Sequence, residues 1–299
     1  MVVTWRGAEH VADCLDALAR QSRAHRTLVV DNASDDGSAR IVAAHPSGPE
    51  VLTLPRNLGY AGGIAAAMSM VDTPFTAWLN DDAAPDPGWL AALEDALAAA
   101  PGAAAAGSRL ERPDGSVQSL GVRLTADGHG ADVTDPGVEP FGFCGGAVLL
   151  RTGVLRDLGG VPAAFFCYYE DTDTAWRLRL AGWDVVTAAR ARAVHRHGAS
   201  TRPGSPRFHL WNERNRLLML LRCAPAAVAA RQLAHFAILT LVLPLRHGRP
   251  DAPNFRFGLR ARALAGVIGR LPGTLAARRA VGARATADRG AVWRRWAAG

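Results

Sequence analysis

Short apolar runs alternate with amphipathic helical patterns along the first hundred residues. Residues 27–30 and 75–79 are apolar runs, rich in β-branched or aromatic side chains, that stop at polar clusters, and residues 86–100 repeat apolar side chains at helical spacing. Strands that alternate with helices are typical of βαβ units. The pattern therefore predicts an α/β fold in which a mixed, mainly parallel sheet is flanked by helices.

The pattern changes in the middle of the chain. Residues 107–140 are rich in Gly, Asp and Pro, which predicts hairpins and loops that face a ligand cleft. We expect a strand over 141–150, a helix over 172–181 and a strand over 184–187. From residue 209 the pattern is helical, so we divide the chain into an α/β domain, 1–208, and a C-terminal helical region, 209–299.

The charge of the chain is unevenly distributed. The 299 residues are 49% hydrophobic and 20% charged, which is enough for a full core and excludes wholesale disorder. Residues 201–299 carry 18 arginines against three acids, whereas residues 1–200 carry 16 arginines against 24 acids. The C-terminal region is therefore expected to prefer an anionic neighbour.

An apolar stretch covers residues 233–245 of this basic region. Its 13 residues are too few to cross a bilayer, which needs about 20. With Arg231, Arg246 and Arg249 at its ends it suits a helix in the plane of lipid headgroups, and a core-facing helix explains it equally well. The start lacks a signal-peptide pattern and the four cysteines lie far apart, so we expect a cytoplasmic location.

Polar residues follow the first of the two early strands. They are Asp31, Asn32, Ser34 and Asp35. Ligands of open α/β sheets bind beyond the carboxyl ends of strands. A carboxylate fixed there can accept the ring N–H of a pyrimidine, while hydroxyl and amide groups bind ribose or phosphate. Ordinary turn and helix-capping chemistry explains the same residues.

A glycine-rich segment, residues 56–63, precedes a helix expected over 64–71. Asn57 and Gly62 lie in this segment. Glycine permits a close backbone approach, and the N–H groups of a helix start can bind phosphate. Neither the P-loop pattern nor G-x-G-x-x-G occurs in the sequence, which argues against an NTPase or a dehydrogenase.

The second strand runs into Asn80, Asp81 and Asp82. Clustered carboxylates repel one another unless a cation neutralises them, so a divalent metal shared with substrate phosphates is the expected occupant. A capping cluster for the next helix is the alternative. Two histidines downstream, His195 and His197, become metal ligands only if the fold brings them to Asp82.

Three acids follow a largely aromatic segment, residues 165–169. Glu170, Asp171 and Asp173 enter a predicted helix there. A carboxylate beside apolar walls can have its pKa tuned for base catalysis. Acids also stabilise the first turn of a helix. One of these acids can therefore cap the helix while another acts as a base.

Taken in order, these segments resemble the family 2 glycosyltransferases, the inverting GT-A enzymes, and especially their bacterial rhamnosyltransferase-like branch. The resemblance rests on five motifs within residues 27–200: V-D-N-x-S-x-D-G-S, R-N-x-G-x-x-G-G, N-D-D, Y-Y-E-D-x-D-x-x-W-R and H-x-x-G-x-S. It implies a GT-A fold. The strict D-x-D metal motif of the family is replaced here by N-D-D, and only residues 1–5 are left for a first strand.

The resemblance also implies roles for individual residues. Those that would bind the nucleotide sugar are Thr4, Asp31, Asn32, Ser34, Asp35, Asn57, Gly62 and Asp81. Asp82 would bind a divalent metal, Mg²⁺ or Mn²⁺, with Asn80 and His195 in support. Asp171 would be the catalytic base, and Glu170 is the alternative.

The activity implied is transfer of a sugar from a dTDP- or UDP-linked donor, rhamnose from dTDP-rhamnose on branch resemblance. The acceptor would be a saccharide or lipid-linked hydroxyl of the cell envelope or of a polysaccharide, reached from the anionic inner membrane face. A catalytically silent scaffold or carbohydrate-binding partner is the alternative, against which the presence of Asp82 and Asp171 argues. Nucleic-acid binding by the basic tail is not expected, because no recognised module accompanies it.

Overall fold

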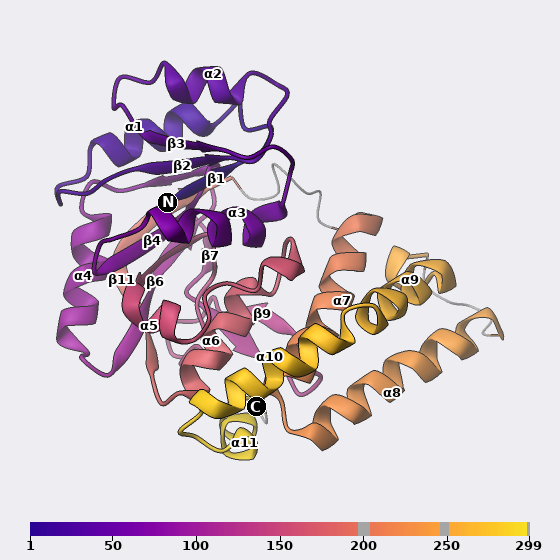
Figure 1. The fold of residues 1–299 in the computed structure, drawn as a ribbon. Coiled ribbons are helices and arrows are strands. Elements are labelled where there is room, and N and C mark those ends of the chain that lie inside the picture. The colour runs from indigo at the N-terminus through magenta and orange to yellow at the C-terminus, as the bar shows by residue number, and fades with distance from the viewer. Residues whose placement is uncertain (197–203, 246–250, 298–299) are drawn as a thin grey trace.

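A curled nine-stranded sheet, covered by helices on both faces, forms the centre of the molecule (Figure 1). The structure is a computed structural model that describes residues 1–196, 204–245 and 251–297. The strands of this sheet are β1 (Val2–Thr4), β2 (Leu28–Asp31), β3 (Glu50–Thr53), β4 (Phe75–Asn80), β5 (Ala83–Pro85), β6 (Ala103–Glu111), β7 (Val117–Ser119), β10 (Ala147–Arg151) and β11 (Asp184–His195). A separate hairpin pairs β8 (Val122–Leu124) with β9 (Gly130–Asp132).

The sheet is mixed. Its order is β3-β2-β1-β4-β10-β6-β11-β5, with β7 beside β6. Strands β1 to β4 are parallel, and β10 runs antiparallel between β4 and β6. This confirms the expected α/β class, although four of the strand pairs of this sheet are antiparallel and four are parallel in the described part of the chain.

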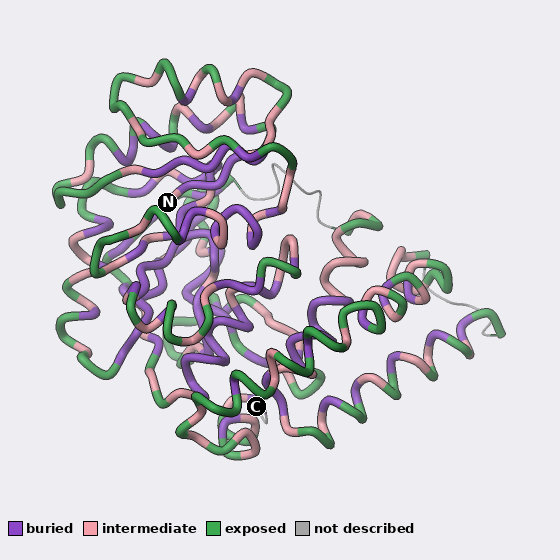
Figure 2. Tube along the Cα trace, viewed as in Figure 1, coloured by how far each residue is buried: buried purple, intermediate pink, exposed green. Residues whose placement is uncertain are grey.

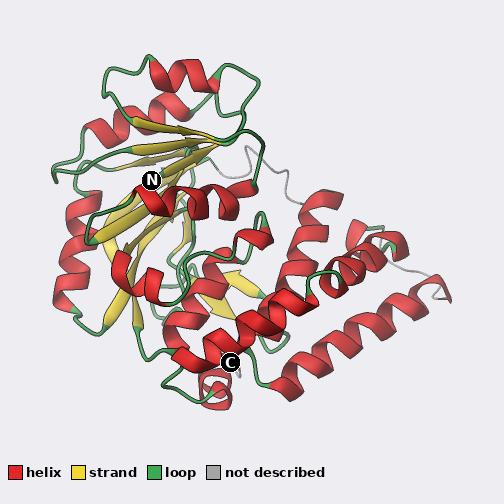
Figure 3. Ribbon diagram, viewed as in Figure 1, coloured by secondary structure: helices red, strands yellow, loops and turns green. Residues whose placement is uncertain are grey.

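Helices surround the sheet and extend beyond it on one side (Figure 3). Those of the α/β part are α1 (Val11–Ala19), α2 (Ser38–Ala43), α3 (Gly59–Ala67), α4 (Trp89–Ala99), α5 (Thr152–Asp157) and α6 (Glu170–Leu180). The C-terminal region contributes α7 (Pro206–Cys223), α8 (Ala226–Val242), α9 (Phe257–Ile268), α10 (Leu271–Arg284) and α11 (Arg289–Ala297). Short 3₁₀ turns occur at Met68–Met70, Ala163–Phe165, Leu243–Leu245 and Pro253–Phe255.

Alternation along the strands creates two apolar cores. Val29 and Leu79 point to the face covered by α1 and α4, whereas Val30 and Trp78 point to the opposite face. The second core continues into the C-terminal helices, where the ring of Trp293 stacks on that of Trp176 with centroids 5.8 Å apart. The two parts of the chain therefore share one core, and their boundary at residues 208 and 209 remains a proposal.

Several predicted elements have different bounds. The strand expected over 141–150 begins only at Ala147, because the backbone of Gly142 instead pairs with Val122 of the small hairpin. The helix expected from residue 64 begins at Gly59, where the side chains of Asn32 and Asn57 accept hydrogen bonds from backbone N–H groups at its start. The glycine-rich segment thus lies largely inside the helix.

The apolar stretch at 233–245 belongs to a longer helical segment. Helix α8 and the turn after it make a continuous run of 20 residues, Ala226–Leu245, within which an 18-residue window has a mean hydropathy of 1.7 and is 28% buried. Length and composition therefore do not exclude a membrane span, contrary to the expectation from 13 residues, although they are weak evidence for one. Arg246, Arg249 and His197 lie outside the described residues.

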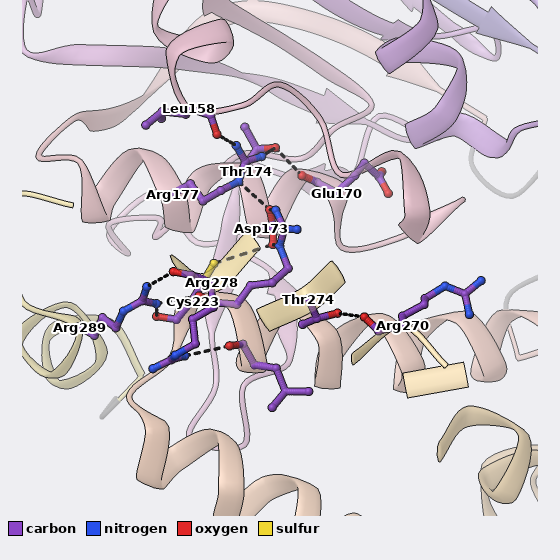
Figure 4. Close-up of polar contacts among 12 residues, drawn as sticks. Leu158, Glu170, Asp173, Thr174, Arg177, Cys223, Arg270, Thr274, Arg278 and Arg289 are labelled. Carbon is purple, nitrogen blue, oxygen red and sulfur yellow. Dashed lines mark hydrogen bonds and ion pairs between the residues drawn. The ribbon is translucent and has the colours of Figure 1, made fainter. Parts of the chain in front are cut away.

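A buried carboxylate connects α6 to α7 (Figure 4). Asp173, which is fully buried, accepts from Nε of Arg177 at 2.7 Å and from Nε of Arg222 at 2.6 Å. Burial opposes ionisation of Asp173, but the two guanidinium groups outweigh it and lower the pKa of the carboxyl. Arg177 also donates to the carbonyl of Leu158 and to the hydroxyl of Thr174.

Replacing Asp173 with Asn should destabilise the fold by about 3 kcal/mol, because two buried guanidinium groups lose their counter-charge. Urea denaturation at pH 7 measures this loss. The wild-type contribution is present above the ordinary aspartate pKa and disappears as the pH falls through the lowered pKa of Asp173. The exposed Asp157 provides a control, and an equal small effect of Asp173→Asn and Asp157→Asn would contradict the assignment.

Candidate functional site

A cavity of about 740 Å³ opens beyond the carboxyl ends of β1, β2 and β4. The strand register places these ends together, since Thr4 pairs with Asp31 and Val3 pairs with Asn80. The cavity is bounded on the other side by the loop before α6 and by the start of α7. This is the position at which open α/β sheets bind ligands.

The loop after β2 is held mainly by its own acids. Asp31 accepts from the backbone N–H of Ser34 at 3.0 Å, and Asp35 forms an ion pair with Arg6 at 2.6 Å. Ser34 accepts from the backbone N–H of Arg6 at 3.1 Å. Only Asn32 of this loop lines the cavity, and its amide also bonds to the backbone at the start of α3.

The glycines of α3 serve close packing. A Cβ on Gly59 would lie 2.2 Å from the carbonyl oxygen of Phe166, and one on Gly63 would lie 2.7 Å from Val3. A Cβ on Gly62 would collide with Leu58 at 2.6 Å. Gly62 does not line the cavity, whereas Asn57 does. The need for glycine at position 62 is therefore explained by packing within the helix start.

Two polar oxygens at the floor of the site are buried close to each other. They are the hydroxyl oxygen of Thr4 and Oδ2 of Asp81. Burial raises the pKa of Asp81 to about 6. A hydrogen bond from Thr4 to Asp81 partly offsets the effect of burial, and the charge of Asp82 adds to it.

Asp82 lies beside His195. Pairing of β11 with β5 sets His195 opposite Ala83, and Nε2 of the ring is 3.0 Å from Oδ1 of Asp82 and 3.1 Å from the amide nitrogen of Asn80. Nδ1 is 3.1 Å from Oε1 of Gln118. Burial opposes ionisation of Asp82, but the hydrogen bond and charge of His195 lower the pKa of the carboxyl.

This arrangement fits a divalent cation. In the metal-bound protein Nδ1 would donate to Gln118, and the unprotonated Nε2 would bind the cation together with Asp82, in place of the hydrogen bond between these two side chains. Ligands at about 2.1 Å in adjacent octahedral positions are about 3 Å apart, which matches the contact of Asp82 with His195. Across the described residues no three His, Cys, Asp or Glu side chains surround one point. Substrate oxygens and water would therefore have to complete the shell.

The loop before α6 has an unusual backbone. Phe166, Tyr168 and Tyr169 have φ values of 69°, 71° and 69°, in the left-handed region that non-glycine residues rarely occupy. Such strain persists only where surrounding contacts enforce it, and it concentrates at functional sites. The amide of Asn215 enforces it here by donating to the carbonyls of residues 165, 167 and 168 at 2.9, 2.7 and 2.9 Å.

Asp171 is the acid best placed to exchange a proton with a ligand. Its Oδ2 accepts from the backbone N–H of Gly145 at 2.9 Å, and its Oδ1 accepts from the N–H of Thr172 at 2.6 Å. The side chain is partly exposed and lines the cavity. Burial by the surrounding protein raises the pKa of Asp171 despite these hydrogen bonds.

Glu170 differs from its neighbour. It is 6% exposed, and its Oε2 is buried without a hydrogen-bond partner. Burial, followed by the charge of Asp171, raises the pKa of Glu170 to about 8. Glu170 is therefore largely protonated at neutral pH, whereas a general base must be ionised to accept a proton.

The structure brings most of the predicted site residues to one cavity. Those that line it are Asn32, Asn57, Asn80, Asp81, Asp82, Glu170, Asp171 and His195. Those that lie outside its lining are Thr4, Asp31, Ser34, Asp35 and Gly62. Thr4 still lies between two lining residues, Val3 and Trp5. The roles of the predicted site residues, inside and outside the lining, stay predictions.

Some lining residues were not anticipated from the sequence. Gln118 and Asp132 come from the hairpins of the Gly-, Asp- and Pro-rich segment, and Arg207, Phe208 and Trp211 come from the first turns of α7. No motif marks either group. The only available signal was the expectation that residues 107–140 face a cleft.

Comparisons with known proteins agree with this geometry. A family model described as glycosyl transferase family 2 matches residues 1–159. An N-acetylglucosaminyl-diphospho-decaprenol L-rhamnosyltransferase of Mycobacterium tuberculosis is 30% identical over 245 residues, covering 70% of this chain and 79% of that protein. The O-antigen biosynthesis protein RfbC of Myxococcus xanthus is 30% identical over 148 residues, 44% of this chain and 12% of that protein.

Solved structures share the fold. GalNAc-T7, crystallised with UDP, GalNAc and Mn²⁺, has a TM-score of 0.62 at 9% identity, with coverage of 91% of this chain and 56% of that one. Residues 1–349 of S. aureus TarS, in complex with UDP-GlcNAc, give a TM-score of 0.58 at 17% identity and cover 94% and 86%. At these identities the likeness concerns the fold alone.

Replacing Glu170 with Gln should stabilise the protein above pH 8. In the wild type, stability is lost as the pH rises from the ordinary pKa of 4.5 to about 8, because the carboxyl ionises in the unfolded chain while it stays protonated in the folded protein. The variant should lack this loss and be more stable by about 1–3 kcal/mol at pH 9, measured by urea denaturation between pH 5 and 9. The exposed Glu9→Gln serves as control, and parallel pH profiles for wild type and Glu170→Gln would refute the prediction.

Proposed function

The chain belongs to glycosyl transferase family 2 and has the GT-A fold, and we propose that it is a metal-dependent, inverting hexosyltransferase. The donor is dTDP-L-rhamnose, and the acceptor is a sugar hydroxyl of a cell-envelope or polysaccharide precursor. One observation carries the proposal: a single cavity holds the pair of Asp82 and His195 together with Asp171. A metal ligand set and a base are what displacement of a nucleoside diphosphate needs.

The strand-end side of the cavity is proposed to bind the donor. Asp82 and His195 would hold Mg²⁺ or Mn²⁺, and Asn80 would support them. The bound cation would stabilise the negative charge that builds on the diphosphate as it leaves. Mn²⁺ is present in the crystals of GalNAc-T7 and of a mannosyltransferase from Pyrobaculum calidifontis with GDP-Man, which supports a divalent cation here.

Asn32 and Asn57 would orient the nucleotide. Both line the cavity and are fixed by hydrogen bonds to the backbone at the start of α3, at 2.8 and 2.7 Å. Side chains that are already held in place lose little freedom when a ligand binds. The carboxyl group of Asp81, which lines the cavity, would accept a hydrogen bond from the donor.

Asp171 is proposed to take the proton of the acceptor hydroxyl. Its position at the start of α6 is fixed by Gly145 and Thr172, and its raised pKa makes the carboxylate a stronger base than a solvated aspartate. Attack by that hydroxyl from the face of the sugar opposite the diphosphate gives a single displacement. The anomeric configuration is then inverted.

The donor and acceptor classes are drawn from the relatives. The M. tuberculosis protein is named for transfer of L-rhamnose to N-acetylglucosaminyl-diphospho-decaprenol. We therefore propose an N-acetylglucosaminyl diphosphate attached to a lipid as the acceptor. Its lipid would remain in a membrane, so the enzyme would act as a peripheral protein on the cytoplasmic membrane face.

Helix α8 is proposed to contact that membrane. Its inner face packs on α7 and α9, and Figure 2 shows exposed stretches along the rest of the helix. Ile238, Leu241 and Leu245, on the segment that α8 begins, are 59%, 69% and 78% exposed. No acid occurs between Ala226 and Leu245. Of the three acids of residues 201–299, Glu213 and Asp251 form ion pairs with arginines of that region. The third, Asp288, accepts a hydrogen bond from the backbone N–H of Ala291 at the start of α11. An apolar ridge in such a basic region suits an anionic bilayer.

Asp171→Asn should lower kcat by 10²- to 10⁴-fold and leave the KM for the donor nearly unchanged, because a base is removed while the donor contacts remain. Release of nucleoside diphosphate from dTDP-rhamnose with Mn²⁺ and a lipid-linked acceptor measures this. In the wild type, kcat should rise with pH to a plateau above the raised pKa of Asp171. EDTA should abolish the release in both proteins.

Glu170→Gln is the matched control for the same assay. It alters the neighbouring carboxyl, and kcat should stay within about 10-fold of the wild type because that carboxyl is already protonated at pH 7. A large loss in Glu170→Gln with a small loss in Asp171→Asn would transfer the role of base to Glu170.

The double variant Ile238→Ser, Leu241→Ser should bind anionic vesicles at least about 10-fold more weakly than the wild type, since burial of each apolar side chain contributes about 1.5 kcal/mol or more. Cosedimentation with phosphatidylcholine vesicles containing phosphatidylglycerol measures this. Val138→Ser removes an exposed apolar side chain elsewhere and should bind normally. Equal binding by all three proteins, or equal binding to neutral vesicles, would exclude this face of α8.

A further inference from the structure

One wall of the cavity has no part in the proposed donor site. It is formed by the first turns of α7 and by the strained loop before α6. The ring of Trp211 lies 4.8 Å from that of Phe166, and the ring of Phe208 lies 5.1 Å from that of Tyr168, measured between centroids. These four aromatic residues line the cavity and are only partly buried. Such a surface suits the apolar face of a sugar ring.

The aromatic wall is rigid before any ligand arrives. Asn215 fixes the loop through its three carbonyl contacts, and Arg214 donates to the carbonyl of Phe165 at 2.7 Å. Ser205 caps α7 by accepting from the backbone N–H of Phe208 at 3.2 Å. A preorganised wall binds a ligand without the entropic cost of ordering side chains.

The charges of the cavity are unequal. Its lining contains the acidic side chains of Asp81, Asp82, Asp132 and Asp171, besides the largely protonated Glu170. Within the described lining, Arg207 is the single arginine. Its guanidinium group is exposed and has no hydrogen bond or ion pair with the described residues. Arg216, further along α7, already forms an ion pair with Glu213.

We propose that Arg207 binds a phosphate group attached to the acceptor sugar, whose ring packs on Trp211 and Phe208. The inference rests on the proposed function and assigns the residues of the same cavity that bind the acceptor. A cation held by Asp82 and His195 would balance the donor diphosphate, so a second anion in this acidic cavity needs its own positive partner. A planar guanidinium binds phosphate through two parallel hydrogen bonds.

The test compares Arg207→Ala with the wild type on three acceptors. They are N-acetylglucosamine 1-phosphate, octyl N-acetylglucosaminyl diphosphate and the neutral octyl N-acetylglucosaminide. The KM for both phosphate-bearing acceptors should rise roughly 10- to 100-fold, with kcat and the donor KM changed by less than about threefold. The neutral acceptor should be used equally by both proteins. A loss confined to the octyl diphosphate would place Arg207 at the second phosphate of a lipid-linked acceptor.

Arg279→Ala is the control, because Arg279 is an exposed arginine of α10 that does not line the cavity. Equal losses on charged and neutral acceptors, or a raised KM for the donor, would overturn the inference. Calorimetric binding of N-acetylglucosamine 1-phosphate to wild type and Arg207→Ala tests it without turnover. A protein that binds this phosphate through Arg207 but uses no donor would refute the proposed function alone, and equal binding of both this phosphate and octyl N-acetylglucosaminyl diphosphate by the two proteins would refute the inference.

Discussion

The buried carboxylate of Asp173 links the parts of the molecule on which the site depends. It lies between the guanidinium groups of Arg177 on α6 and Arg222 on α7, and removal of such a charge leaves its partners uncompensated. The contact sets α7 against α6. Helix α7 then presents Asn215 to the strained loop, and α6 presents Asp171 to the cavity. A structural ion pair thereby determines where the proposed base lies.

Three acids within four residues have three different environments. Asp173 is paired with arginines and its pKa is lowered, whereas the pKa of Asp171 is raised by burial although backbone N–H groups contact it. Glu170 has no hydrogen-bond partner for its buried Oε2, and its pKa rises to about 8. The surroundings therefore separate a structural charge, an ionisable base and a largely neutral acid on one helical turn.

The sequence predicted the fold class and the residues that stand in compact motifs at strand ends, because strand register alone brings such residues together. Asn32 and Asp82 are examples, and His195 reaches Asp82 through simple pairing of β11 with β5, whereas Asp171 lies in a motif at the start of α6. Contacts between distant segments were not predictable. Arg222 is 49 residues from Asp173. Gly62 looks like part of a binding loop in the sequence and is explained by packing in the structure.

The central claim is that the strand ends bind a metal-linked nucleotide sugar while Asp171 faces the opposite side of that sugar. A crystal structure of the protein with Mn²⁺ and an unreactive dTDP-rhamnose analogue, phased with anomalous scattering from manganese, tests it directly. The account predicts an anomalous peak in contact with Asp82 and His195, and the Asp171 carboxylate on the side of the anomeric carbon opposite the diphosphate. A peak elsewhere, or a donor lying with its diphosphate against Asp171, would contradict it.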